Sequence, residues 1–91
     1  MDKLMFSIFD KVSELYEPPF IEINKGTAMR RVTDLMQSNP QSPYTKFPDN
    51  YTLVQVGTWD ELGGIPLNDK APSTIIELME LLTPKDMENK Q

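Results

Sequence analysis

Eight prolines divide this 91-residue chain into short segments and limit where regular structure can run. Proline lacks a backbone N–H and has a fixed φ, so it disrupts helices and the central strands of sheets. None of the eight interrupts a long stretch of helical or strand periodicity, so they mark the joints between elements. They are Pro18, Pro19, Pro40, Pro43, Pro48, Pro66, Pro72 and Pro84.

Four segments between these joints predict β-strands. In the first, Leu4, Phe6 and Ile8 recur at every second position and share one face. The third is the clearest, because it is rich in β-branched and aromatic side chains. Pro66 favours a sheet edge for the fourth. The four segments are residues 4–9, 20–23, 51–59 and 65–67.

Two further segments have the spacing of amphipathic helices. The first follows the turn at residues 24–26, ends at residues 38–40, and has its apolar positions at i, i+4, i+7 and i+8. The second begins after Pro72, where Thr74 to Glu77 fits a capping box, and ends at Thr83. The apolar stripes are Ala28, Val32, Leu35 and Met36 in the first helix, and Ile75, Leu78, Met79 and Leu82 in the second.

The predicted element order is therefore β-β-α-β-β-α, with a proline-rich loop at residues 39–50. This order is typical of an α+β domain, in which helices pack on one face of a small, mainly antiparallel sheet. A chain of this length makes one domain. We expect that domain at residues 1–83 and a frayed tail at residues 84–91.

Composition excludes several functional classes. The chain has no cysteine and no histidine, which removes disulfides, cysteine zinc sites and the commonest general base. Its apolar runs are too short to span a membrane. No phosphate-binding motif is present, and the adjacent Asp60 and Glu61 are interpreted as solvated turn residues. We expect a non-enzymatic protein with no catalytic residues, no cofactor, no metal site and no membrane contact.

The charge is acidic and unevenly spread. Nine Lys and Arg face 14 Asp and Glu, for a net charge of -5. Residues 1–48 hold six of each sign, whereas residues 49–91 hold three cations and eight anions, so the whole deficit lies in the C-terminal half. Contact with nucleic acid would have to come from the N-terminal half.

That half contains an interleaved set of aromatic and basic residues. Single-stranded nucleic acid is held by aromatic faces that stack on bases and by cations that follow the backbone. The candidate nucleic-acid-binding residues are Arg30, Arg31, Tyr44, Lys46 and Phe47. The alternative is that Phe47 and Tyr51 anchor the long loop to the core while Lys46 faces solvent.

Self-association and protein binding are further possibilities. The expected sheet has short edge strands and a thin core, and the chain contains six methionines. Met29, Ile76 and Leu81 lie beside the apolar stripes of the two helices and widen them. A homo-oligomer would cover these faces.

The chain also resembles a known family over residues 6–70. The residues that carry the likeness are Ile8-Phe9-Asp10-Lys11, Pro19-Phe20, Asn24, Gly26, Ala28, Arg30, Lys46, Pro48-Asp49, Tyr51, Leu53, Gly57 and Asp60. In order and spacing they resemble the small nonstructural protein of gokushovirus-type microviruses, which are single-stranded DNA bacteriophages. The resemblance implies a phage protein made in the host bacterial cytoplasm and absent from the virion.

Members of that family are described as DNA-binding or single-stranded-DNA-synthesis proteins that act around the switch from replication to packaging. The family supplies no catalytic residues. Of the matching positions, Arg30 and Lys46 are free to meet a phosphate. We therefore expect a phage accessory protein that binds single-stranded DNA as a homo-oligomer. The alternative is a module that engages a host factor, or a phage replication or scaffolding protein, without touching DNA.

Overall fold

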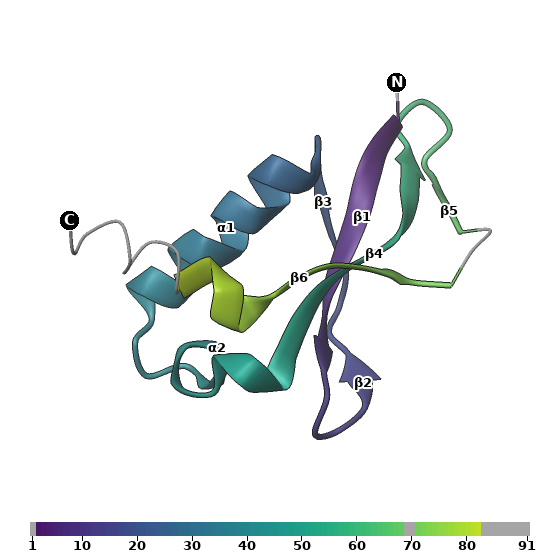
Figure 1. The fold of residues 1–91 in the computed structure, drawn as a ribbon. Helices are drawn as coiled ribbons and strands as arrows, with labels where there is room; N and C mark the ends of the chain where they lie inside the picture. Colours follow the sequence, from purple (N-terminus) through teal and green to yellow (C-terminus); the bar gives the residue numbers. More distant parts are fainter. Residues whose placement is uncertain (1, 69–70, 83–91) are drawn as a thin grey trace.

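The computed structural model describes residues 2–68 and 71–82, which form one sheet with helices beside it (Figure 1). In chain order the elements are β1 (Asp2–Asp10), β2 (Leu15–Tyr16), β3 (Phe20–Glu22), α1 (Lys25–Ser38), α2 (Pro43–Lys46), the 3-10 helix η1 (Pro48–Asn50), β4 (Tyr51–Asp60), β5 (Ile65–Leu67) and β6 (Ser73–Glu77). Residues 78–82 are again helical.

Two long strands, β1 and β4, form the centre of the sheet. They pair antiparallel along their whole lengths, from Asp2 opposite Asp60 to Asp10 opposite Tyr51. The outer edge of β1 pairs with β2 and β3, and the outer edge of β4 pairs with β5 and β6. All of these pairings are antiparallel. Each edge of the sheet consists of two short strands, β2 and β3 beside β1, and β5 and β6 beside β4.

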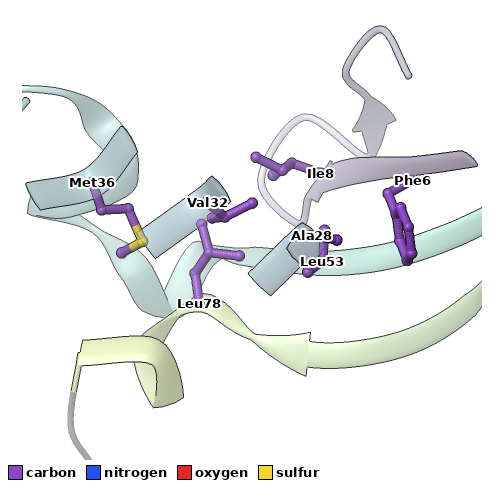
Figure 2. Close-up of a cluster of buried hydrophobic side chains, with 7 residues drawn as sticks. All are labelled: Phe6, Ile8, Ala28, Val32, Met36, Leu53 and Leu78. Atoms are coloured by element: carbon purple, nitrogen blue, oxygen red, sulfur yellow. The ribbon is translucent and has the colours of Figure 1, made fainter. Parts of the chain in front are cut away.

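The core joins one face of this sheet to α1 and to the last helical turn. Phe6, Ile8 and Leu53 come from the two central strands (Figure 2). Ala28, Val32 and Met36 form the buried stripe of α1. Leu78, at the start of the last helical segment, packs into the same cluster. Chain segments that are far apart in sequence therefore share one small core.

The prediction of a helix starting directly after Pro72 is wrong for its first turn. Residues 73–77 form β6, which pairs with β4, and the helical residues begin at Leu78. Thr74, Ile75 and Ile76 are β-branched, and such side chains fit a strand better than a helix. Glu77 does not complete a capping box; its carboxylate instead accepts hydrogen bonds from Thr52 Oγ1 and Lys11 Nζ.

The predicted order β-β-α-β-β-α is also incomplete in the N-terminal half. Residues 39–50 are not an unstructured loop, because they contain α2 and η1. The two-residue strand β2 forms a hairpin with the end of β1. Leu35, expected in the apolar stripe of α1, is 42% exposed.

The α+β class and the mainly antiparallel sheet are confirmed. The four predicted strands are all present, and their observed counterparts β1, β3, β4 and β5 differ in length by only a few residues. The first helix ends where Ser38-Asn39-Pro40 predicted. The expected tail at residues 84–91 lies outside the described residues.

The start of α1 is fixed by a reciprocal cap, which gives a first testable prediction. Asn24 Oδ1 accepts from the backbone N–H of Thr27 at 2.9 Å, and Thr27 Oγ1 accepts from the N–H of Asn24 at 3.3 Å. We expect Asn24→Ala to lower the free energy of unfolding by about 1 kcal/mol. Urea denaturation measures this, with Asn24→Ser as the control that keeps a cap. Equal losses in both variants would contradict it.

Candidate functional site

A groove of about 640 Å³ lies beside α1. One wall is the segment of residues 17–20, which runs from β2 to β3. The other wall is the side of α1 that carries Arg31, Asp34 and Leu35, at helical i, i+3 and i+4 spacing. Tyr44 from α2 also lines the groove, together with Ile8 and Val32 of the core.

The first wall is held in place by hydrogen bonds to β1. The hydroxyl of Ser7 donates to the carbonyl oxygen of Glu17 at 2.6 Å, and the Glu17 N–H donates to the carbonyl oxygen of Ile8 at 2.9 Å. Pro18 and Pro19 follow and restrict the backbone further. The wall is therefore fixed before any ligand arrives.

Arg31 is the only cation among the residues that line the groove, and it is already engaged. Its Nη1 lies 3.0 Å from Glu22 Oε2, and its guanidinium stacks over the ring of Phe20, 4.7 Å from the centroid. Phe20 and Glu22 share a face because they are two residues apart on β3. Sequence periodicity placed Arg31 on the exposed side of α1; the structure gives it two partners there.

Two carboxylates on the groove walls have no such partner. Among residues 2–68 and 71–82, neither Glu17 nor Asp34 forms an ion pair. Because Glu22 balances Arg31, these four side chains together carry a formal charge of -2, from three carboxylates and one guanidinium. The groove therefore combines apolar walls with a net negative charge.

Contacts with other side chains of the protein fix the orientation of the Tyr44 ring. Its ring makes an edge contact with Tyr51, with the centroids 4.7 Å apart, and it packs against the core. Burial, followed by the negative charge of Glu17, raises the pKa of Tyr44 above its ordinary value. One face of this ring is thus used inside the protein.

Lys46 and Phe47 project at the other end of α2. Thr45 anchors that helix to the end of α1, because its hydroxyl donates to the carbonyl oxygens of Met36 at 2.8 Å and Asn39 at 3.0 Å. Phe47 remains 53% exposed, and Lys46 is exposed as well. The alternative in which aromatic side chains anchor the loop while Lys46 faces solvent is therefore confirmed for Tyr51 and Lys46 and wrong for Phe47; Tyr44 packs against the core in its place.

The five candidate residues consequently do not form one cluster. Arg31 and Tyr44 line the groove, and Lys46 and Phe47 adjoin each other on α2. Arg30 is exposed and is about 100° around α1 from Arg31. Among the residues that the structure describes, neither Arg30 nor Lys46 forms an ion pair.

The groove is not predicted from the sequence, although the position of Leu35 in the helical repeat of α1 was a signal for it. Leu35 was assigned to the core because it continues the i, i+4, i+7 spacing of α1. Leu35 lies at the edge of the apolar stripe of α1. The other residues of the stripe are buried in the core, whereas Leu35 lines the open groove. Phe20, which lies in the second predicted strand, forms the aromatic part of the opposite wall.

Within residues 2–68 and 71–82, no group of three or more acidic, histidine or cysteine side chains is placed to hold a metal ion. In the same part of the chain, no helix has the length and apolarity needed to cross a membrane.

Comparison with known proteins identifies the family. The family model of the phage ORF5 protein matches residues 3–81, which includes every strand except the first residue of β1, as well as α1, α2 and the groove. No curated protein and no solved structure is significantly similar to the chain. Because the match covers most of its length, the chain belongs to the phage ORF5 protein family.

Proposed function

We propose that this phage protein is a non-enzymatic accessory factor of a gokushovirus-type microvirus that binds single-stranded DNA during genome synthesis or packaging. Two lines of argument support the proposal: the motif series of the microvirus nonstructural proteins, and membership of the phage ORF5 family. It would act in the cytoplasm of the infected bacterium, where the viral genome is copied.

The observation that carries the proposal is the exposed pair Lys46 and Phe47. A ring that is 53% exposed offers a face on which a base can stack, and an adjacent cation without an ion-pair partner is available to a phosphate. Arg30 is a second available cation. Arg31 and Tyr44 have a weaker claim, because their charge and ring face already have partners.

A single copy would bind DNA weakly. The net charge is -5, and only a few cations are free to approach a phosphate, so repulsion offsets much of the attraction. A homo-oligomer would compensate by presenting several sites to one strand. The exposed apolar residues of the β4–β5 hairpin, Leu62, Ile65 and Leu67, are surfaces that a second copy would cover.

Fluorescence anisotropy with a labelled oligonucleotide at low and physiological salt tests this proposal. We expect Lys46→Ala and Arg30→Ala each to weaken binding about three- to tenfold, and Phe47→Ala to weaken it by about 1–3 kcal/mol. Two phosphate contacts in each copy, by Lys46 and Arg30, predict that log K falls with log salt at a slope of about -1.4 for that copy. Light scattering on the same sample gives the oligomeric state.

Lys3→Ala is the matched control, because it removes the same charge from a lysine that pairs with Glu61 at 2.8 Å and lies on β1. Its affinity should stay close to that of the parent. Absence of binding at low salt, where attraction to phosphate is strongest, would exclude the DNA role. The alternative, an interaction module that never touches DNA, would then be the better account of the acidic surface.

A further inference from the structure

The groove beside α1 has apolar walls that the chain covers only in part: the guanidinium of Arg31 lies over the ring of Phe20, whereas the side chain of Leu35 is open to solvent. Leu35 is 42% exposed although it continues the apolar stripe of α1. Phe20 faces it from β3, and Pro18 and Pro19 complete the opposite wall. Water against these side chains is unfavourable, so an apolar group that displaces it gains free energy. Ile8 and Val32, both buried in the core, line the same hollow.

The charge of the groove narrows the class of occupant. Arg31 is neutralised by Glu22 at 3.0 Å, whereas Glu17 and Asp34 have no ion-pair partner among residues 2–68 and 71–82. These carboxylates come from opposite walls, Glu17 from the segment before β3 and Asp34 from α1. A ligand lying along the groove would therefore meet negative charge on both sides of an apolar strip.

We propose that this groove binds a segment of a partner protein in which an aliphatic or aromatic side chain is flanked by lysine or arginine. The apolar side chain rests against Leu35 and against the prolines of the opposite wall, Pro18 and Pro19. The flanking cations approach Glu17 and Asp34. Grooves that hold extended segments in this way take affinity from the apolar anchor and specificity from the charges.

The same charges disfavour two other occupants. A nucleic acid would bring phosphates toward unpaired carboxylates, and like charges in such proximity oppose binding. A second copy of this chain has a net charge of -5, which disfavours this acidic groove as the contact and favours the apolar residues of the β4–β5 hairpin for the proposed homo-oligomer. The groove is thus a different surface from Lys46 and Phe47, and its occupant does not depend on the DNA proposal.

The probe is a short peptide with a Lys-Leu-Lys core flanked by glycine and serine, added to the isotope-labelled full chain. Amide chemical shifts report both where it binds and how tightly. We expect the largest shifts at Phe20 and at residues 34 and 35 of α1. Peptides with a Glu-Leu-Glu or a Lys-Ser-Lys core should bind at least about tenfold more weakly, because each lacks one of the two contacts.

Asp34→Lys should weaken the Lys-Leu-Lys peptide about five- to tenfold, since it replaces an attraction with a repulsion. Glu80→Lys is the matched control, because Glu80 is an exposed carboxylate outside the groove and its replacement makes the same change in net charge. Leu35→Ser tests the apolar anchor at a position exposed enough to tolerate it.

The proposal is overturned by any of four results. The peptide could shift amides away from the groove, or bind Asp34→Lys and Glu80→Lys equally well. Groove amides could respond to an oligonucleotide and not to the peptide, which would make the groove a DNA site. They could instead respond to dilution of the protein alone, which would identify a second copy as the occupant.

Discussion

Replacing Phe6 with alanine is expected to unfold a large fraction of the molecules at 25 °C. Phe6 is fully buried at the centre of the core, and its ring packs against that of Phe20 with the centroids 6.0 Å apart. Removing a buried phenylalanine ring costs about 3–5 kcal/mol, from lost burial and from the cavity left behind. Single domains are stable by only about 5–15 kcal/mol, and small ones lie toward the lower end.

Urea denaturation followed by far-ultraviolet circular dichroism measures this loss. Phe47→Ala is the matched control, because it deletes the same ring from a position that is 53% exposed. We expect it to change the free energy of unfolding by less than about 0.5 kcal/mol. The same comparison is a control for the DNA-binding experiment. A loss of DNA affinity in Phe47→Ala can be assigned to the missing ring only if that variant is still folded. Similar losses in Phe6→Ala and Phe47→Ala would mean that Phe6 is not the centre of the core.

The strands and α1 could be predicted because their signals are local. Alternation in β1, β-branched residues in β4 and a 3.6-residue period in α1 each depend on neighbours along the chain. The cap at Asn24 belongs to the same kind, because the donor and acceptor are three residues apart. These features depend only on residues that are close in the sequence. They can therefore be predicted without knowing the order of the strands in the sheet.

The β1–β2 hairpin was missed because its turn lacks the usual glycine. Asp10 Oδ1 accepts hydrogen bonds from the N–H groups of Val12 and Ser13. Glu14, the next residue of the turn, has a positive φ of 63°, which is the conformation that glycine usually supplies. These backbone hydrogen bonds, that from Val12 first, lower the pKa of Asp10. The recognised β4–β5 turn has the same plan, with Asp60 accepting from two N–H groups and Gly64 at φ 69°.

The β6 segment shows where local signals compete. Thr74 to Glu77 satisfies the pattern of a capping box and also contains three consecutive β-branched residues. The exposed edge of β4 decides between them, because a strand there gains a ladder of hydrogen bonds and the carboxylate of Glu77 reaches Thr52 and Lys11. None of these partners is near residue 77 in the sequence.

The candidate site was predictable only in part for the same reason. The exposure of Lys46 and Phe47 depends on how α2 is anchored, which Thr45 determines through Met36 and Asn39. The loss of Arg31 as a free cation depends on Glu22 and Phe20, which lie on a different element. The sequence indicates which side chains are of a type that stacks on a base or meets a phosphate. Whether those side chains are exposed or already engaged by other residues depends on the fold.

Gly57→Ala is expected to detach β5 from the sheet. A Cβ built on Gly57 would overlap the backbone carbonyl oxygen of Leu67, which belongs to β5 and cannot rotate away as a side chain could. The pairing of β1 with β4 also changes register next to this position, between Met5 and Phe6, so the local geometry is already constrained. We expect a loss of about 1–3 kcal/mol in the free energy of unfolding.

Hydrogen exchange locates this loss and distinguishes it from general unfolding. Among Thr58, Trp59 and Asp60, the amides that face β5 should lose protection, while the β4 amides that face β1 keep theirs. Gly26→Ala is the control, because a Cβ there lies 3.4 Å from Asn24 Oδ1 within a helix that favours alanine over glycine. It should be as stable as the parent or more so, by up to about 1 kcal/mol.

Equal behaviour of the two glycine variants would mean that β5 can move aside without cost. In that case the edge of β4 near Gly57 would be held only by its hydrogen bonds, and the exposed apolar residues of the β4–β5 hairpin would be free to rearrange. A site-specific loss in Gly57→Ala alone would instead show that the hairpin is fixed in the free protein. The apolar surface of Leu62, Ile65 and Leu67, on which the proposed homo-oligomer depends, would then be preformed in the single chain.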